Sequence, residues 1–296
     1  MKGSRTTVIA VASGKGGTGK TTVAAHLALV SAHRRKTLLA DLDVEAPDSL
    51  GYFRSAIPIG TAISVPVAIP RFHEELCAGC RLCAQSCRFG AIVAIGKSVT
   101  INDQICKGCG RCVSICPEAA LSEVEIEVGE TTLYRNSAFD IVEGRMTIGD
   151  IRSTAVIEAA KRRAAEHDAE LQIRDCPPGV SCPATHAIEG AEYVVLVMEP
   201  TEFSLHDLKA AIELVQGRGL PAGVVINKDG FGDADVSAFC ELNAVPVIGR
   251  IAFNRERAAS GAAGMLWEDD PGFMSEMARI LETAMAATYG SAGGRP

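Results

Sequence analysis

The chain has 296 residues, of which 47% are hydrophobic and 22% are charged, proportions that are ordinary for a globular protein. Its formal net charge of −7 gives it no general attraction to nucleic acid. No apolar run approaches the roughly 20 residues that a membrane-spanning helix needs. We therefore expect a cytoplasmic protein without stable membrane anchoring.

Apolar runs rich in β-branched residues alternate along the chain with segments of helical periodicity. The first run, Thr7–Ala12, leads into a glycine-rich loop. Near-continuous Val and Ile runs separated by helices predict an α/β domain with a mainly parallel sheet and helices on both faces. We expect further strands over 37–40, 63–69, 171–174, 193–197, 223–226 and 247–251, and helices over 20–33 and 151–167.

The glycine-rich loop has the pattern of a phosphate-binding loop, and it lies after a strand and before a helix, as that chemistry requires. Glycines there let backbone N–H groups converge on phosphate oxygens. Lys20 is expected on the β- and γ-phosphates of ATP, and the hydroxyl of Thr21 on Mg²⁺. The residues expected to bind the nucleotide here are Gly14, Lys15, Gly16, Gly17, Thr18, Gly19, Lys20, Thr21 and Thr22.

Eight of the eleven cysteines form two runs with the same spacing, C-x2-C-x2-C-x3-C. In a reducing compartment such runs bind metal rather than form disulfides, and zinc is one candidate. The spacing resembles a bacterial two-cluster ferredoxin, in which the fourth cysteine of each run ligates the other cluster. This resemblance assigns Cys77, Cys80, Cys83 and Cys116 to one 4Fe–4S cluster, and Cys106, Cys109, Cys112 and Cys87 to a second.

The phosphate loop carries an additional lysine, Lys15, directly after its first glycine. The string from Lys15 to Thr22 resembles the deviant Walker A motif of the MinD/ParA/Mrp superfamily, which also includes the nitrogenase iron protein. The resemblance implies a MinD-like P-loop NTPase fold. Four later segments resemble further motifs of that superfamily. They are Asp41-Leu42-Asp43 with Pro47, Asp175-Cys176-Pro177-Pro178-Gly179, Glu199-Pro200-Thr201 and Asn227-Lys228.

The same resemblance implies a nucleotide-sandwich dimer, formed with a second copy or with a paralogue. In such a dimer Lys15 reaches the phosphates that the partner binds, and Asp43 positions the attacking water. Asp175 is expected to hold Mg²⁺ through water. Asn227 is expected to read the adenine, with Lys228 beside it.

The cysteine segment interrupts one α/β domain rather than following it. We expect the first part of the ATPase domain over 1–69 and an inserted α+β ferredoxin-like domain over 70–122. The second part of the ATPase domain is expected over 123–288, and a flexible tail over 289–296.

Three cysteines lie outside the two runs. Cys182 follows Asp175 at the spacing of a cluster-binding cysteine in nitrogenase iron proteins, so a third metal site with Cys176 is one hypothesis. The alternative is that both are small buried residues near the start of a helix. Cys240 is expected in the core.

A phosphate loop and two cluster motifs in one chain predict an ATP-hydrolysing iron–sulfur protein. Our leading hypothesis is that closure of the dimer gates electron transfer to a redox partner. An Mrp-like carrier or scaffold that delivers clusters to an apo-acceptor protein is the alternative. A MinD-like positioning ATPase is a third hypothesis, which gives no role to eight cluster ligands.

Overall fold

The computed structural model describes residues 5–291, and the chain divides into two compact units. Unit 1 comprises the chain up to Ala62, the stretch Thr131–Arg145 and the chain from Ile157 onward. Unit 2 comprises Ile63–Glu130 and Met146–Val156, and it contains both cysteine runs.

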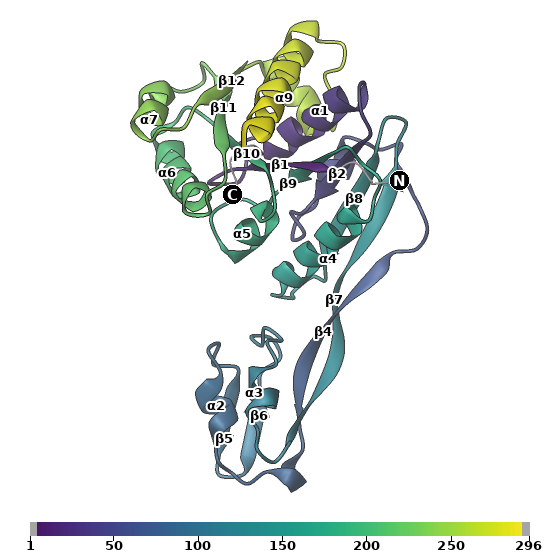
Figure 1. Ribbon diagram of the computed structural model, residues 1–296, viewed down its shortest axis with the longest axis vertical. Helices are drawn as coiled ribbons and strands as arrows, with labels where there is room; N and C mark the ends of the chain where they lie inside the picture. The colour runs from purple at the N-terminus through teal and green to yellow at the C-terminus, as the bar shows by residue number, and fades with distance from the viewer. Residues whose placement is uncertain (1–4, 292–296) are drawn as a thin grey trace. The chain divides into compact units, whose positions relative to one another are not determined.

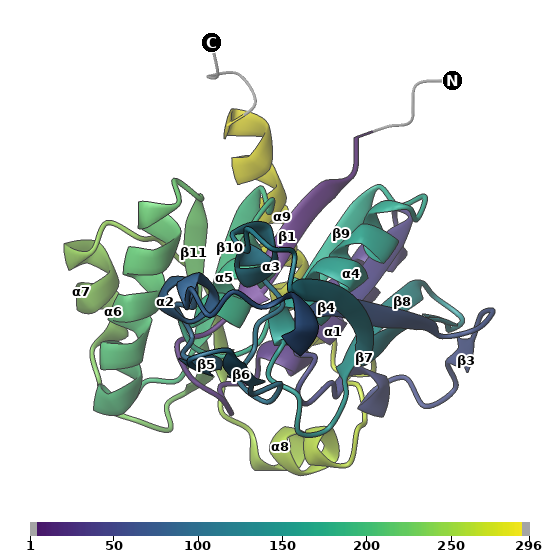
Figure 2. The same ribbon diagram turned by 90° about the horizontal axis from the view of Figure 1, so that it is seen from below.

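Unit 1 is built on a mainly parallel sheet with the strand order β12-β11-β10-β1-β9-β2-β8-β7-β3 (Figure 1). Strand β1 (Thr7–Ala12) lies between β9 (Leu171–Asp175) and β10 (Tyr193–Met198) and is parallel to both. Figure 2 shows β11 and β3 toward opposite sides of this sheet. The other strands are β2 (Thr37–Asp41), β3 (Ile57–Pro58), β7 (Leu121–Arg135), β8 (Asp140–Met146), β11 (Ala222–Asp229) and β12 (Val247–Ala252). Strand β7 continues from unit 2, and the part of it from Thr131 onward belongs to unit 1.

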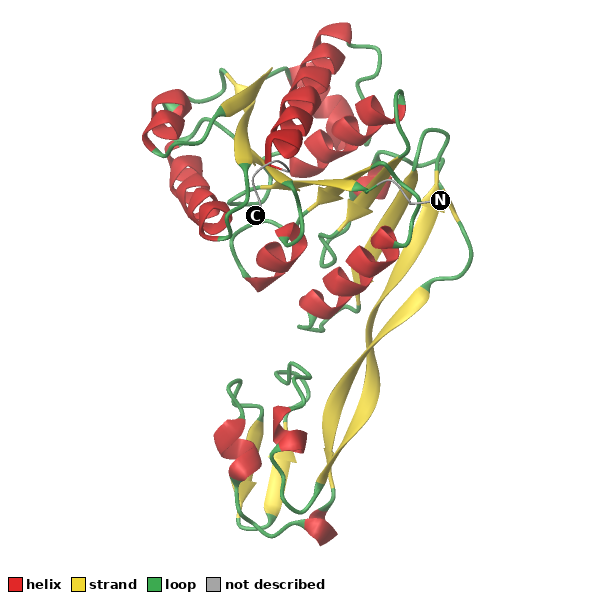
Figure 3. Cartoon of the chain, in the orientation of Figure 1, coloured by secondary structure: helices red, strands yellow, loops and turns green. Residues whose placement is uncertain are grey.

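Helices cover both faces of the sheet, as Figures 1 and 3 show. Helices α1 (Lys20–Ala32) and α9 (Pro271–Ser291) pack against each other on one face. The opposite face is covered by α4 (Ser153–Ala165), α5 (Cys182–Ile188) and α6 (Glu202–Gly217). The remaining helices of unit 1 are α7 (Val236–Leu242), α8 (Arg255–Ala262) and the 3-10 turn η1 (Ser49–Gly51).

The core of unit 1 forms because the central strands are buried on both faces. Side chains such as Ile9, Ile173 and Val195 are fully buried, and they pack against Leu27 of α1 and Ile280 of α9. A strand without a solvent face needs continuous apolar sequence, and this is the pattern from which the strands were predicted. The prediction of a mainly parallel α/β sheet with helices on both faces is confirmed.

Strands β7 and β8 were missed because their sequences are not continuously apolar. In β7, charged residues such as Glu123, Glu125 and Glu127 alternate with apolar ones, as expected where one face of a strand meets solvent. The strand expected over 63–69 is β4 (Ile63–Phe72), but it lies in unit 2 and pairs with β7.

Unit 2 contains a hairpin and two short helices, drawn in Figure 3. Strands β5 (Ile92–Ile95) and β6 (Ser98–Ile101) pair antiparallel, and α2 (Leu82–Ser86) contacts α3 (Arg111–Ser114). A 3-10 turn, η2 (Glu74–Leu76), precedes the first cysteine run. The buried side chains form two small cores, to which the cysteines themselves contribute: Cys83 and Cys112 lie in one, and Cys106 in the other.

Helix α9 ends at Ser291, so it extends into the segment 289–296 for which a flexible tail is expected. Residues 292–296 lie outside the described part of the chain. Between residues 5 and 291, no helix is both long enough and apolar enough to cross a membrane.

Candidate functional site

The phosphate loop lies at the carboxyl end of β1, in the middle of the sheet. Gly17 (φ 77°) and Gly19 (φ 91°) have left-handed backbone conformations that turn the loop into α1. A Cβ atom at Gly14 would overlap the backbone oxygen of Asp207, and one at Gly19 would overlap the side-chain amide of Asn227. Glycine is therefore favoured by backbone conformation at position 17, by lack of space at position 14 and by both at position 19.

The two lysines of the loop have different surroundings. Lys20 begins α1 and is 6% exposed. Lys15 lies near the start of the loop, and its Nζ donates to Oε1 of Glu199 at 2.5 Å. The second carboxylate oxygen of Glu199 accepts from Nζ of Lys228 at 3.0 Å, and that ammonium also donates to the carbonyl oxygen of Gly17 at 3.0 Å. We call Lys15, Glu199 and Lys228 the lysine–glutamate cluster.

Acidic side chains gather beside the loop, where β2 and β9 end. Asp41, Asp48 and Asp175 each offer one carboxylate oxygen to a group whose atoms lie within 4.8 Å of one another. Asp41 and Asp175 are fully buried. Asp41 accepts hydrogen bonds from the backbone N–H groups of Asp43 (3.2 Å) and Ser49 (3.0 Å).

The charge state of these carboxylates follows from their burial. Burial raises the pKa of Asp175 to about 7 against the opposing effect of Lys20, and burial together with Asp175 raises that of Asp41. Neither carboxylate oxygen of Asp175 has a hydrogen bond of normal geometry to any described residue. A divalent cation that prefers oxygen ligands, such as Mg²⁺, would reduce the repulsion between the Asp41 and Asp175 carboxylates. It would also give the Asp175 oxygens the partner that they lack.

Asp43 differs from these two residues in keeping partial access to solvent. Burial raises its pKa to about 6, while the ammonium of Lys20 opposes the rise. A carboxylate with a pKa near neutrality can exchange a proton with a neighbouring water, which is compatible with the predicted role in positioning water.

A cavity of about 560 Å³ adjoins the loop and brings together residues that are far apart in sequence. The predicted site residues that line it are Gly17, Gly19, Thr22, Asn227 and Lys228. The Nδ2 of Asn227 donates to the carbonyl oxygen of Thr18 at 2.8 Å, which links the end of β11 to the loop. Lining residues that the sequence did not suggest include Asp48, Tyr52, Arg54, Phe253, Arg257 and Trp267.

The eight cysteines of the two runs line two separate cavities in unit 2. One cavity is lined by three cysteines of the first run together with the last cysteine of the second. The other is lined by three cysteines of the second run together with the last cysteine of the first. The two sets are Cys77, Cys80, Cys83 and Cys116, and Cys87, Cys106, Cys109 and Cys112.

The two runs have the same local geometry. Each bends through a left-handed residue, Arg81 (φ 64°) or Gly110 (φ 69°), into a short helix. The backbone N–H of Ala91 donates to Sγ of Cys87 at 3.3 Å, and four residues after Cys116 an N–H donates to its Sγ at the same distance. Such donors stabilise a thiolate over a thiol.

The spread of the sulfur atoms limits what each cavity fits. A tetrahedral zinc ion with Zn–S bonds near 2.3 Å holds its sulfur ligands about 3.8 Å apart. Among the described residues, no three cysteine sulfurs lie within 4.8 Å of one another. Four cysteines that bind a single zinc ion would hold their sulfurs closer together than this.

The cysteines near the end of β9 have unlike surroundings. Cys176 is fully buried, and burial raises its pKa to about 12, whereas Cys182 is exposed at the start of α5. Cys176 thus has the properties of a buried core residue, and a third metal site stays a hypothesis. Cys240 is buried, as expected.

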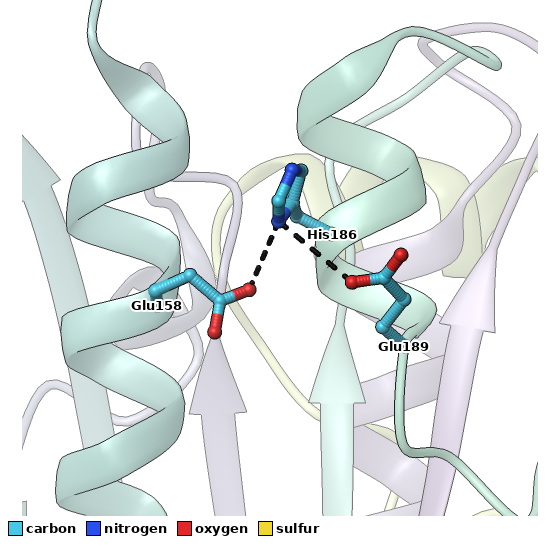
Figure 4. A group of neighbouring side chains, drawn as sticks. All are labelled: Glu158, His186 and Glu189. Atoms are coloured by element: carbon cyan, nitrogen blue, oxygen red, sulfur yellow. Dashed lines mark hydrogen bonds and ion pairs between the residues drawn. The ribbon is translucent and has the colours of Figure 1, made fainter. Parts of the chain in front are cut away.

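A further group of ionisable side chains, shown in Figure 4, joins α4 to α5 and to the residue after α5. His186 Nδ1 lies 3.1 Å from Glu158 and 3.8 Å from Glu189. Glu158 also pairs with Lys161 at 2.9 Å, and Glu189 pairs with Arg218. Because each carboxylate already has a cationic partner, we interpret this group as an ion-pair network that ties the helices together.

The chain matches, over residues 9–267, the family described as the CobQ/CobB/MinD/ParA nucleotide binding domain. Two uncharacterized proteins of Methanocaldococcus jannaschii are similar to it. One is 30% identical over 228 residues, covering 76% of this chain and 79% of that protein. The other is 27% identical over 234 residues, covering 77% and 82%.

Solved structures share the fold at low sequence identity. The septum site-determining protein MinD of Pyrococcus horikoshii, complexed with Mg-ADP, has a TM-score of 0.57 and 19% identity, over 94% of this chain and 96% of that chain. The MinC:MinD complex of Aquifex aeolicus gives a TM-score of 0.54 and 16% identity, over 95% and 96%. Together with the family match and the geometry of the phosphate loop, these similarities show that the chain belongs to the CobQ/CobB/MinD/ParA nucleotide-binding family.

Proposed function

We propose that this protein binds and hydrolyses ATP and uses a nucleotide-dependent dimer to gate electron transfer through two 4Fe–4S clusters. The observation that carries the proposal is the presence, in one chain, of a phosphate loop and two cavities that are each lined by four cysteines. Neither feature alone would link nucleotide to redox chemistry.

The nucleotide part of the proposal rests on the residues beside the loop. Backbone N–H groups of the loop and Lys20 would bind the phosphates. Thr21 and Asp175 would hold Mg²⁺, since the Asp175 carboxylate is buried without a hydrogen bond of normal geometry. Asp43 would orient the water, and Lys15 would act on the phosphates held by the second subunit. The Mg-ADP bound by the Pyrococcus MinD structure supports the choice of ligand.

The redox part of the proposal rests on the two cysteine sets. The sulfur atoms are spread more widely than around a single ion, and backbone N–H groups donate to three of them. When bound, 4Fe–4S clusters supply one-electron transfer. Cys80 and Cys109 are exposed, so these residues mark the sides from which a redox partner would approach.

The position of the other cysteines favours electron transfer over cluster delivery. Cys83, Cys106 and Cys112 belong to the small cores of unit 2. Ligands that are part of a core hold a resident group, whereas a delivered cluster needs ligands that exchange easily. The cluster-carrier alternative would depend on the exposed Cys182.

The first test is metal content after purification without oxygen. We expect about eight iron and eight sulfide per chain, in keeping with two 4Fe–4S clusters. Lys20→Ala should retain the iron but lose ATP binding, because only the ammonium on the phosphates is removed. Lys209→Ala, a change of an exposed lysine on α6, serves as the matched control and should bind ATP normally.

The second test is coupling between the two parts. The reduction potentials of the clusters should shift when a non-hydrolysable ATP analogue binds, and they should not shift in Lys20→Ala. Finding zinc in place of iron would refute the redox part of the proposal. If iron is present but the reduction potentials of the clusters do not change when nucleotide binds, the proposed gating of electron transfer would be refuted.

A further inference from the structure

The lysine–glutamate cluster contains two cations and one anion, at the surface where the phosphate loop would meet a nucleotide. The Lys15 side chain is 28% exposed, that of Glu199 15% and that of Lys228 35%. A pair that is shielded from water to this degree interacts more strongly than an ordinary surface ion pair. Lys15 is therefore held by its own subunit.

The backbone places Glu199 for this contact. It directly follows β10, which neighbours β1, so its carboxylate lies next to the loop that follows β1. Lys228 approaches from β11 with a left-handed backbone (φ 54°), a conformation that is uncommon for a residue with a side chain. One oxygen of Glu199 thus holds Lys15, and the other holds Lys228, which in turn contacts the carbonyl of Gly17.

A lysine ammonium that is bound to this carboxylate is not free to bind a phosphate elsewhere. The proposed function requires Lys15 to contact the phosphates that the second subunit binds. In the single chain, Lys15 contacts Glu199 of its own subunit instead. We therefore expect formation of the dimer to exchange the carboxylate of Glu199 for phosphate oxygens as the partner of Lys15.

We propose that Glu199 is a positioning residue that holds Lys15 within its own subunit. Lys15 is released when the phosphates of a nucleotide bound by a second copy replace the Glu199 carboxylate as its partner. This inference rests on the proposed nucleotide-sandwich dimer and adds the group that opposes its closure. A triphosphate competes better with a carboxylate than a diphosphate does, because it carries more charge. Glu199 therefore sets the nucleotide concentration at which the chain dimerises, and it discriminates against ADP.

The first experiment measures the contact itself, in the chain without nucleotide. Trace acetylation followed by mass spectrometry reports how freely each lysine amine reacts. Glu199→Gln removes the charge with little change in shape, so Lys15 should become about threefold more reactive relative to Lys20. Glu202→Gln, the same charge change at an exposed position in α6, should leave this ratio unchanged. An unchanged ratio in Glu199→Gln would overturn the inference.

The second experiment measures dimerisation by sedimentation, with a non-hydrolysable ATP analogue and with ADP. Glu199→Gln should dimerise at about tenfold lower analogue concentration and should begin to dimerise with ADP, whereas Glu202→Gln should match the native chain. If Glu199 acted through Lys228 on the loop instead, Lys228→Gln would reproduce the effect, and the assignment to Lys15 would be wrong.

Failure of the dimer and failure of the inference give different results. A native chain that binds the analogue but stays monomeric would refute the sandwich dimer, and with it this role of Glu199. A native chain that dimerises while Glu199→Gln dimerises no more readily would refute the role of Glu199 alone. Glu199→Asp keeps the charge but shortens the side chain, and it should shift dimerisation in the same direction if Glu199→Gln does not fold.

Discussion

At the scale of single residues, burial controls the charge of side chains around the phosphate loop. Burial raises the pKa values of Asp41, Asp43 and Asp175, and it lowers that of His26. The carboxylates are destabilised as anions until a cation reaches them, which keeps the site ready for a metal-bound nucleotide. His26 is destabilised as a cation, and this has a consequence for folding.

His26 lies in α1, and both of its ring nitrogens have hydrogen-bond partners only when the ring is neutral. Its Nε2 accepts from the backbone N–H of Trp267 at 3.1 Å, so the ring proton lies on Nδ1, which donates to the carbonyl oxygen of Thr22 at 2.7 Å. The ring also stacks on Trp267 with centroids 5.0 Å apart. Protonation of Nε2 would break the contact with Trp267, and burial lowers the pKa of His26 to about 4.

We expect His26 to make the chain less stable in mild acid. The pKa of His26 is about 4 in the folded chain, below its ordinary value of 6.5, so between these pH values the unfolded chain binds a proton that the folded chain does not. The contribution of His26 to the free energy of unfolding should therefore fall by at most about 3 kcal/mol as the pH drops through this range, and it should stop falling below the folded-state pKa. Chemical denaturation at a series of pH values measures it.

The control for this prediction is His26→Leu, because the leucine side chain is apolar and cannot bind a proton. As the pH drops through mild acid, the native chain should lose stability relative to His26→Leu, even if the variant is the less stable of the two at neutral pH. Asp43 and Asp175 have raised pKa values that act in the opposite direction, but they are present in both proteins and cancel in the difference. Parallel pH profiles would contradict the prediction.

At the scale of elements, strands and loops differ in how far sequence predicts them. The central parallel strands were predictable because a strand buried on both faces must be continuously apolar. The phosphate loop was predictable because its glycines and lysine have fixed spacing. The contact of Lys15 with Glu199 was not, because it depends on β1 and β10 being neighbours in the sheet. Asp48 and Tyr52 were missed because they lie in an irregular loop without a spacing rule.

The second cysteine run depends on close packing against β4. Gly108 has a left-handed conformation (φ 66°), and a Cβ there would overlap the side chain of Val67 and approach the carbonyl oxygen of Ala68 at 2.9 Å. Gly108→Ala should therefore displace the run that carries Cys106 and Cys109. We expect it to lower the iron content toward about half, measured on protein purified without oxygen.

Gly90→Ala provides the matched comparison. Gly90 has nearly the same backbone conformation (φ 65°), but a Cβ there would meet nothing within 4 Å. It carries the conformational cost of about 1 kcal/mol without the steric clash. Equal iron loss in both variants would show that backbone strain, rather than packing against β4, is responsible.

At the scale of the whole molecule, the two units differ in the size of their cores. Unit 1 has an extensive apolar core that joins the sheet to α1 and α9. Unit 2 has two small cores in which buried cysteines are members. A unit with so little apolar interior depends on additional cross-links, which a bound metal group would supply.

With the proposed clusters in unit 2, removal of their iron should therefore unfold unit 2 and leave unit 1 folded. After anaerobic chelation, limited proteolysis should cut rapidly within 74–120, whereas residues 157–288 should stay protected. Nucleotide binding should persist, because the phosphate loop and its cavity lie in unit 1. An iron-free chain that resists the protease throughout would show that the cores of unit 2 suffice without metal.

Each cavity is lined by three cysteines of one run and the last cysteine of the other run. This arrangement affects when, during synthesis, each set of four cysteines becomes complete. The cavity that contains Cys77 is closed by Cys116, and the one that contains Cys106 also needs Cys87 and Cys112. During synthesis on the ribosome, neither set of four cysteines is complete until most of the intervening polypeptide has emerged. In the proposed iron–sulfur protein, maturation of the two centres would thus be a late event in translation of this segment, and a nascent chain that ends before Cys112 would carry neither in complete form.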